Sequence, residues 1–286
     1  MRIGVVYPQI ELGGDPEAVR RIGRAAEELG FDHLLAYDHV LGAVHADRTP
    51  ELVGPYTERD PFHDPFVMFA HVAAITERIE LVTGVIILPQ RQTALVARQA
   101  ADVDLLSGGR LRLGVGVGWN HVEYEALGQD FTTRGARQEE QIGLLRRLWT
   151  EPVVDVAGRF DRIDRAALVP RPTRSIPIWL GGWGRAPRER AARLADGFIF
   201  GGRLDVVSSG WDEVRRLAAE HGRDPAELGA EWMIPATKGP ADVAAKIEAW
   251  AAAGGTHASV ITMGAGLDST EAHLDRMAAV AEAVGR

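Results

Sequence analysis

The chain has 286 residues, of which 46% are hydrophobic and 25% are charged, and its formal net charge is -8. This composition is typical of a globular protein with a sizeable core, and the acidic balance argues against nucleic acid or an anionic membrane as the main partner. The chain has no cysteine, which excludes disulfides, a thiolate nucleophile and a zinc–thiolate site. No segment approaches the roughly 20 apolar residues of a membrane span, and the first apolar run stops at Pro8, too early for a signal peptide. We therefore expect a cytoplasmic protein.

Short apolar runs alternate with longer amphipathic segments along the chain. The runs are mostly continuous, as in parallel strands that are buried on both faces. We expect strands at Ile3–Tyr7, His33–Tyr37, Glu80–Val85, Leu111–Val117, Ile176–Leu180, Gly197–Phe200, Ala230–Ile234 and His257–Thr262. Apolar residues at helical spacing predict helices at Pro16–Leu29, Arg134–Trp149, Asp242–Ala253 and Thr270–Val284. Eight strands alternating with helices predict one closed (β/α)8 barrel (TIM barrel) spanning residues 1–286 as a single domain, with a doubly wound sheet as the alternative.

Two connections are unusually long for such a barrel. The segment His39–Asp64 leaves the C-terminal end of the second strand and is rich in Gly, Pro and aromatic residues. Long loops in compact domains are often lids or binding loops. The segment Pro152–Ser175 predicts a small hairpin or a loop excursion.

An acid and a histidine, Asp38 and His39, directly follow the second strand. The C-terminal ends of barrel strands line the active-site mouth, where such a pair could orient a ring, transfer a proton or hold a substrate. The alternative is a capping aspartate followed by a loop histidine.

Glycines punctuate the strand that ends in Gly114-Val-Gly-Val-Gly118. The spacing does not match a dinucleotide-binding fingerprint, because the third small residue should stand where Trp119 is found. Glycines that relieve crowding inside a barrel explain Gly114 well and Gly118 less well.

A second glycine-rich strand end, Ile178–Gly184, runs into a helix whose first turn holds Pro187. Free N–H groups at such a helix N-terminus suit a phosphate, whereas the alternative is a left-handed turn without a ligand. Gly201 and Gly202 end the next strand at the same rim.

Metal chemistry is poorly supported by the histidine spacing. The nine histidines include neither a His-x-His strand pair nor a His-Glu-x-x-His helix, and no serine nucleophile elbow is present. We expect no metal, and a metal hydrolase is the most distant alternative.

The segment Arg78–Asn120, with LVTGVIILP, ARQAADVDLLSGGRL and LGVGVGWN, resembles the bacterial luciferase-like flavin-dependent oxidoreductases. The similarity continues through Glu123–Gly128, Pro177–Gly182 and Ala195–Gly197 and covers nearly the whole chain. It is greatest to the actinobacterial subgroup that uses the deazaflavin coenzyme F420. The chain is shorter than the luciferase and alkanesulfonate monooxygenase branches.

The resemblance implies a flavin at the C-terminal mouth of the barrel. Asp38 and His39 would flank the reactive edge of the ring, and Gly84–Val85 would form a non-proline cis peptide behind it. The glycine at 84 would lie against the ring because it lacks a Cβ. The residues expected to contact the cofactor are Asp38, Thr83, Gly84, Val85, Gly116, Val117, Gly118, Trp119, Asn120, Gly181, Gly182 and Trp183.

One position departs from the pattern of the family's sugar-phosphate dehydrogenases. Those enzymes have a proton-transferring acid where this chain has Trp119. His39 is then the best candidate for proton transfer, and Asp38 could set its tautomer or bind the cofactor. The candidate walls of the substrate pocket are Tyr56, Phe62, His63 and Trp119.

The leading functional interpretation is hydride transfer between reduced coenzyme F420 and a small organic substrate. The alternatives are a two-component monooxygenase that uses reduced FMN from a separate reductase, and a flavin-binding protein without catalysis. The resemblance also implies a homodimer, for which the apolar run Phe66–Ala70, with Leu95 and Val96, could supply the face. The same residues could equally pack into the core.

Overall fold

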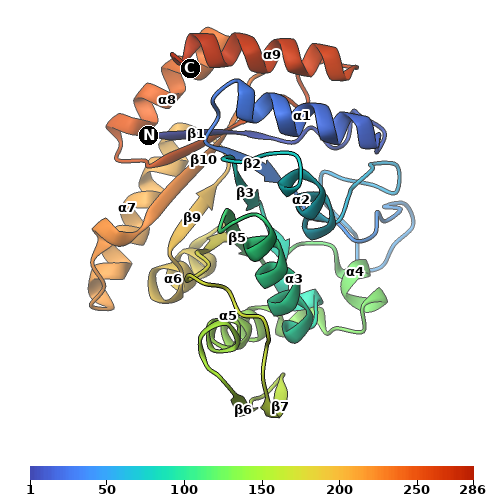
Figure 1. The fold of residues 1–286 in the computed structure, drawn as a ribbon, viewed down its shortest axis with the longest axis vertical. Helices are drawn as coiled ribbons and strands as arrows, with labels where there is room; N and C mark the ends of the chain where they lie inside the picture. The colour runs from blue at the N-terminus through green and yellow to red at the C-terminus, as the bar shows by residue number, and fades with distance from the viewer.

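The computed structural model describes residues 1–286 and contains a closed barrel of parallel strands surrounded by helices (Figure 1). The barrel strands are β1 (Arg2–Val6), β2 (His33–Ala36), β3 (Glu80–Thr83), β5 (Leu111–Gly116), β8 (Ile178–Gly181), β9 (Gly197–Phe200), β10 (Gly229–Pro235) and β11 (His257–Ile261). They follow the order β3-β2-β1-β11-β10-β9-β8-β5, and pairing of Leu81 with Leu111 closes the ring between β3 and β5. This closure confirms the predicted (β/α)8 barrel over the doubly wound sheet, whose edge strands would stay unpaired.

The helices lie outside the barrel and cover its strands (Figure 1). They are α1 (Pro16–Glu28), α2 (Pro65–Ala73), α3 (Thr93–Leu106), α4 (His121–Ala126), α5 (Arg134–Thr150), α6 (Arg185–Leu194), α7 (Leu204–Glu220), α8 (Pro240–Ala252) and α9 (Thr270–Ala283). Both α1 and α2 begin at an Asp-Pro pair. Asp15 accepts a hydrogen bond from the Glu17 N–H at 2.9 Å, and Asp64 accepts from Phe66 and Val67 at 3.0 and 3.1 Å. A capping carboxylate followed by proline at the first position is a strong helix start.

Two short elements interrupt the regular alternation. Strand β4 (Ile86–Ile87) resumes after Gly84–Val85 and pairs with β5. Strands β6 (Val154–Ala157) and β7 (Arg162–Ala166) form an antiparallel hairpin at the bottom of Figure 1. This hairpin confirms the excursion predicted for Pro152–Ser175.

The predicted strand boundaries differ from the observed ones mainly at the barrel mouth. Strands β2, β3 and β5 end before Tyr37, Gly84–Val85 and Val117, which were predicted to belong to them. These residues leave the sheet and line a cavity instead. Strand β8 begins at Ile178 rather than Ile176, because Pro177 has no N–H to donate to the ladder.

The N-terminal half of the barrel interior is filled by a buried charged cluster. Glu231 is fully buried and contacts Arg112 at 2.5 Å, His33 at 2.7 Å and Ser259 at 2.5 Å. Burial acts to raise the pKa of Glu231, but Arg112 and His33 outweigh burial and hold this pKa well below its usual range. With this end packed, space for a ligand is left at the opposite end.

The segment expected at a dimer face is mostly part of the core. Phe66, Met68 and Phe69 on α2 and Val96 on α3 are at most 4% exposed, which contradicts their use as a contact surface. They are buried because they face the barrel. Leu95 and Val67 are exposed, at 51% and 69%, so only these two side chains remain available to a partner.

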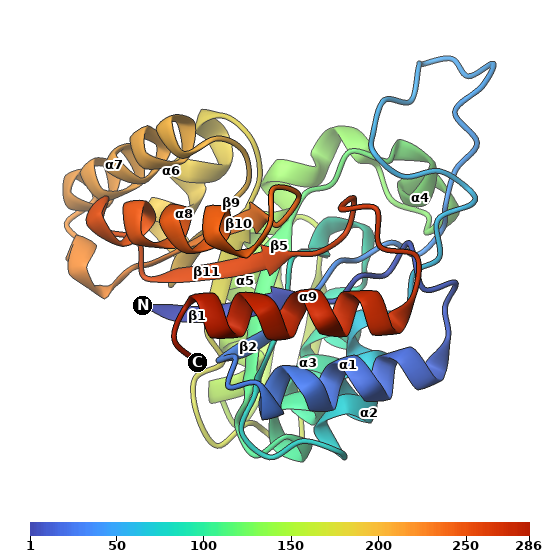
Figure 2. The same cartoon turned by 90° about the horizontal axis from the view of Figure 1, so that it is seen from above.

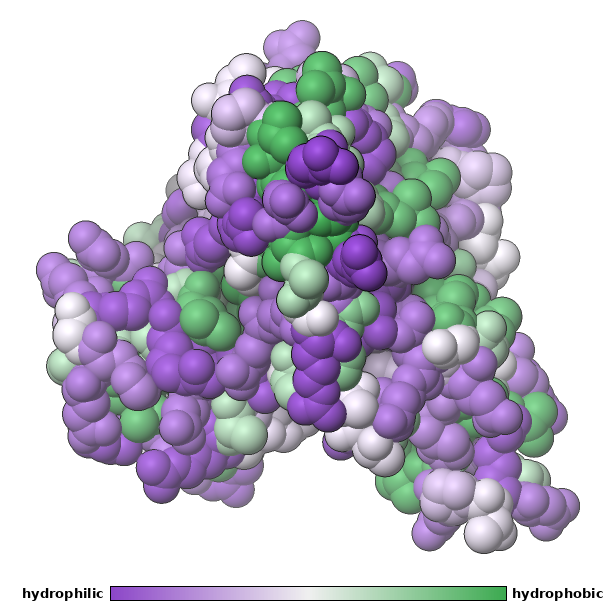
Figure 3. Space-filling model, turned by 90° about the horizontal axis from the view of Figure 1, so that it is seen from below, coloured by the Kyte–Doolittle hydropathy of each residue, from purple (hydrophilic) through white to green (hydrophobic).

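The surface of the molecule is largely polar, and one long loop extends from it. The face seen in Figure 3 is mostly hydrophilic, with apolar side chains in separate groups. None of the helices combines the length and the hydropathy needed to cross a bilayer. The long loop after β2, drawn in blue in Figure 2, extends from the body of the protein next to α4.

Candidate active site

A cavity of about 480 Å³, here called the mouth cavity, lies where the barrel strands end. The C-terminal face of such barrels is where catalytic sites are built. The cavity is lined by Tyr37, Asp38, His39, Tyr56, Gly84, Val85, Ile87, Gly116, Val117, Gly118, Trp119, Arg134, Gly181, Gly182, Trp183, Ile199, Gly201 and Met233. Most residues predicted to form the site are therefore brought together here.

Val85 forms part of the cavity wall and is held there by two glycines. The Gly84–Val85 peptide bond is cis, as the resemblance implied. A Cβ on Gly116 would lie 2.5 Å from Val85 Cγ2, and a Cβ on Gly181 would lie 2.9 Å from Val85 Cγ1. Both glycines are thus needed to admit the valine side chain.

Gly84 lines the mouth cavity and also lacks space for a side chain. A Cβ at this position would lie 2.3 Å from Leu35 Cδ2, inside the barrel packing. Close packing against Leu35 therefore requires glycine here, and the contact of Gly84 with a flat ring stays a prediction.

Asp38 is 3% exposed and braces the segment that follows Val85. Its carboxylate accepts a hydrogen bond from the Ile87 N–H at 2.9 Å and pairs with Arg91 at 2.7 Å. Arg91 also pairs with Asp64, the cap of α2, at 3.0 Å. Burial raises the pKa of Asp38, and Arg91 offsets this rise only in part. Both carboxylate oxygens are engaged away from His39, so Asp38 does not set the histidine tautomer.

Glu123 takes the role that had been considered for Asp38. Its carboxylate is almost fully buried at the first turn of α4 and lies 3.1 Å from His39 Nδ1. The same oxygen accepts the N–H groups of Val40 and Leu41 at 2.8 and 3.0 Å. Because a carboxylate accepts hydrogen bonds, this contact places the ring proton on Nδ1 and leaves Nε2 available in the cavity. Glu123 stands three residues after Asn120, the spacing of a capping box, but its carboxylate bonds the loop after β2 instead, so the local pattern does not predict this contact.

Three aromatic rings surround His39 edge-on. The centroids of Phe62, Tyr56 and Trp119 lie 4.8, 5.3 and 5.5 Å from the imidazole centroid. Trp119 also packs against Gly54 of the long loop, where a Cβ would lie 2.3 Å from the indole ring. The loop therefore closes over the site through a contact that only glycine permits.

The hydroxyl of Tyr56 is suited to donate a hydrogen bond. Burial, followed by the nearby Asp60 carboxylate, raises the pKa of Tyr56 to about 12. The phenol therefore keeps its proton at neutral pH and can donate to a ligand oxygen.

Arg134 and the start of α6 make one side of the mouth cavity suited to an anion. Arg134 lines the cavity, its Nη1 donates to the Phe131 carbonyl at 2.8 Å, and its buried Nε has no hydrogen-bond partner. Helix α6 begins after Gly184 without a side-chain cap, next to Gly182 of the cavity wall. Free N–H groups and a guanidinium are the donors that a phosphate requires. The residues on this side of the cavity therefore fit a phosphate group.

Four predicted site residues lie elsewhere. Thr83 is fully buried and donates to the Gly114 carbonyl at 2.7 Å, below the cavity. The Asn120 side chain caps α4 by accepting from the Val122 N–H at 3.1 Å. The side chains of Thr83 and Asn120 thus bond to the backbone. Phe62 and His63 do not line the mouth cavity.

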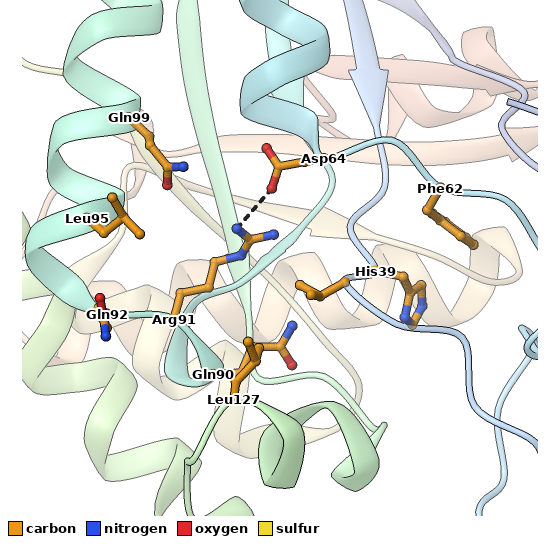
Figure 4. Close-up of a pocket in the computed structure, with 10 residues that line it drawn as sticks. His39, Phe62, Asp64, Gln90, Arg91, Gln92, Leu95, Gln99 and Leu127 are labelled. Carbon is orange, nitrogen blue, oxygen red and sulfur yellow. Dashed lines mark hydrogen bonds and ion pairs between the residues drawn. The ribbon is translucent and has the colours of Figure 1, made fainter. Parts of the chain in front are cut away.

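A second cavity, here called the side cavity, has a volume of about 370 Å³ (Figure 4). Its lining residues are His39, Val40, Phe62, Asp64, Gln90, Arg91, Gln92, Leu95, Gln99 and Leu127. His39 is the residue that it shares with the mouth cavity. The structure contains no group of three or more His, Cys, Asp or Glu side chains placed to hold a metal.

Comparison with known proteins finds a matching family and several similar proteins. The family model described as luciferase-like monooxygenase matches residues 1–237. An uncharacterized protein of Mycobacterium tuberculosis is 35% identical over 210 residues, which cover 71% of this chain and 72% of that protein.

Two further relatives carry functional names. The F420-dependent glucose-6-phosphate dehydrogenase of Intrasporangium calvum is 35% identical over 182 residues, covering 61% of this chain and 50% of that enzyme. The FMNH(2)-dependent dimethylsulfone monooxygenase of Pseudomonas fluorescens is 29% identical over 223 residues, covering 76% of this chain and 57% of that enzyme.

Solved structures show the same fold at low sequence identity. A monooxygenase from Streptomyces bottropensis superposes with a TM-score of 0.82 at 22% identity, covering 99% of this chain and 98% of that chain. An F420-dependent secondary alcohol dehydrogenase in complex with an F420–acetone adduct superposes with a TM-score of 0.81 at 16% identity, with the same coverage.

Proposed function

The chain belongs to the luciferase-like monooxygenase family of flavin- and F420-dependent oxidoreductases and monooxygenases, and we propose that it transfers a hydride between coenzyme F420 and a small organic substrate. The observation that carries this proposal is the position of His39. It is the one histidine among the residues that line the mouth cavity, and its Nε2 is free. Conversion between a carbonyl and an alcohol needs one proton for each hydride, and His39 is placed to handle it.

The residues that would hold the coenzyme follow from the geometry of the mouth cavity. Val85 would lie behind the ring, and Gly182, Trp183 and Arg134 would contact the phosphate-bearing side chain. When bound, the deazaflavin supplies a carbon that gives or accepts a hydride. The protein supplies position, electrostatics and the proton.

The proton path relies on two residues of the chain. Glu123 keeps the proton of His39 on Nδ1, so that Nε2 can take a proton from a substrate hydroxyl or, once protonated, return one to a carbonyl oxygen. Tyr56, which stays protonated, can hydrogen-bond the same oxygen. The edges of Phe62 and Trp119 limit the access of water to the imidazole.

Anaerobic turnover tests this function. Purified protein would be mixed with reduced F420 and a panel of ketones and aldehydes, and oxidation of the coenzyme would be followed optically. We expect substrate-dependent oxidation, which His39→Gln slows by about 10²- to 10⁴-fold, with Gln129→Leu as a control outside both cavities. Turnover that requires oxygen and reduced FMN, with no reaction of reduced F420, would overturn the proposal.

The second candidate function is a monooxygenase that uses reduced FMN from a separate reductase. It is favoured by the match to the dimethylsulfone monooxygenase and by Trp119 at a position where an acid would serve a sugar-phosphate dehydrogenase. Oxygen consumption in the presence of reduced FMN distinguishes it from F420-dependent hydride transfer.

The assembly and location of the enzyme complete the proposal. We infer a homodimer in the cytoplasm, with Val67 and Leu95 as the exposed apolar side chains that would contribute to its interface. Sedimentation of the wild-type protein and of Leu95→Glu tests this directly. A wild-type monomer at micromolar concentration would remove the dimer from the account.

A further inference from the structure

The side cavity contains several buried polar atoms without partners. Gln90 is 1% exposed, yet neither its Oε1 nor its Nε2 has a hydrogen-bond partner. The Nε of Arg91 and the Oε1 of Gln99 are also buried and unpartnered. Buried polar groups in folded proteins are nearly always hydrogen-bonded. Because Gln90, Arg91 and Gln99 all line this cavity, these atoms are candidates to bind a molecule inside it.

The charges of the cavity are already matched. Arg91 pairs with Asp64 at 3.0 Å, the contact drawn in Figure 4, and with Asp38 at 2.7 Å. An added anion would compete with two carboxylates, and an added cation would meet the guanidinium. The chemistry of the cavity thus favours an uncharged ligand.

The unpartnered atoms include both donors and acceptors. Gln90 Nε2 and Arg91 Nε are donors, whereas Gln90 Oε1 and Gln99 Oε1 are acceptors. Figure 4 shows Gln99 extending from α3 toward Arg91 and Asp64. A group that presents a carbonyl oxygen beside an N–H, as in a carboxamide, lactam or urea, matches this set.

The rim of the cavity is apolar. Val40, Leu95 and Leu127 are lining residues with exposed fractions of 39%, 51% and 37%, and Phe62 also lines the cavity. Small-molecule sites combine apolar lining side chains with a small number of placed polar groups, and a volume of about 370 Å³ lies within their usual range. An amphipathic molecule would place its polar head inside and its apolar body at this rim.

We propose that the side cavity is a second binding site, which takes a small uncharged molecule with a carboxamide-type head and a short apolar body. The ligand contacts the face of His39 that belongs to this cavity and is independent of the coenzyme in the mouth cavity. The site therefore gives the protein a means to bind a second molecule next to its proposed proton-transfer residue.

Nuclear magnetic resonance of the full chain, labelled with ¹⁵N at glutamine side chains and free of any coenzyme, tests this site. The probe is benzamide, and benzoate and methyl benzoate are compared with it because they change only the head group. We expect benzamide to shift the Gln90 and Gln99 amide signals saturably and to bind at least tenfold more tightly than the other two. Because no coenzyme is present, the result is separate from the test of hydride transfer.

Two variants localise the binding. Gln90→Leu and Gln99→Leu should each weaken benzamide binding at least tenfold, while Gln129→Leu, whose amide bonds to Arg137 outside both cavities, should leave it unchanged. Retained circular dichroism identifies which variants are folded, and either cavity variant suffices. The proposal is overturned if benzamide causes no saturable shift, as when the cavity holds only water or a second copy of the chain covers its rim. Equal binding by the folded cavity variants would overturn it as well.

Discussion

Glu123 and His39 are 84 residues apart in sequence, and the glutamate oxygen lies 3.1 Å from the histidine Nδ1. The same oxygen holds the backbone of Val40 and Leu41, so one buried carboxylate fixes both the tautomer of the ring and the start of the long loop. Glu123, on α4, is therefore the residue that positions His39 for the proposed reaction, whereas Asp38, the sequence neighbour of His39, organises the barrel mouth.

Replacing Glu123 by glutamine should separate this positioning role from binding. The amide can face Nδ1 with either its oxygen or its N–H, so the imidazole should lose its single tautomer. We expect kcat to fall at least about tenfold while the Kd of the coenzyme stays within a factor of two to three. The ¹⁵N shifts of His39 report the tautomer. An unchanged His39 ring signal together with an unchanged kcat would contradict this positioning role.

Glycine-ended strands and the Asp38-His39 pair could be recognised in the sequence because they depend on local patterns. The strands, the barrel and the position of the mouth cavity follow from those patterns. The contact of Glu123 with His39 did not, because it depends on how a loop of more than 20 residues folds back over α4. Asn120 is expected to contact a ligand, yet its side chain caps α4. Gly84 lines the mouth cavity as predicted and in addition leaves room for Leu35.

The helices show a similar limit. Helices α1, α5, α8 and α9 were located to within two residues from the spacing of their apolar residues. A helical segment was also expected between β3 and β5, where α3 lies, but without bounds. No bounds were predicted for α7, although it has a clear apolar face.

Gly54 should control closure of the long loop over the site. A methyl group at this position would lie 2.3 Å from the Trp119 ring, so Gly54→Ala is expected to push the loop away from the indole. KM for the organic substrate should rise at least about tenfold, since the loop supplies Tyr56 and Phe62. Limited proteolysis should cut the variant faster than the wild type. Gly143→Ala, on α5 with open space around it, serves as the control and should behave as wild type.

Val85 and Gly116 should be energetically coupled in coenzyme binding. Gly116→Ala places a Cβ 2.5 Å from Val85 Cγ2 and should displace the valine from the cavity wall. We expect the coenzyme Kd to rise about tenfold or more, and Val85→Ala in the same chain to restore much of the loss, because the two residues compete for one space. Additive effects of the two substitutions in fluorescence titrations would argue against this coupling.

The stability of the barrel should depend on pH through His257. Burial and the nearby Arg112 lower the pKa of His257 to about 3, below the usual 6.5. A pKa depressed by folding means that the unfolded chain binds the proton more readily. The contribution of His257 to the free energy of unfolding is thus fully present above pH 6.5 and is lost as the pH falls from 6.5 toward 3. Urea denaturation at pH 7 and pH 4.5 should show a smaller pH-dependent loss for His257→Gln than for the wild type. Equal losses would contradict this assignment.

Removal of the buried charge at Glu231 should be more damaging than removal of a surface charge. Glu231→Gln leaves Arg112 without its closest partner in the barrel interior, a change that typically costs about 3–5 kcal/mol. We expect a matching fall in the free energy of unfolding at pH 7. Glu151→Gln removes an exposed pair with Arg147 and should change stability by less than about 1 kcal/mol. Similar losses in the two variants would show that the cluster does not stabilise the barrel.

The assignment of the coenzyme is tested most directly by anaerobic titration of the purified protein with F420 and FMN in parallel, each in its reduced and oxidised forms, followed by fluorescence. Our account predicts saturable binding of F420 at least tenfold tighter than that of FMN, and weaker binding by Arg134→Ala, which lacks the unpartnered donor of the mouth cavity. Tight binding of FMN with no binding of F420 would contradict it.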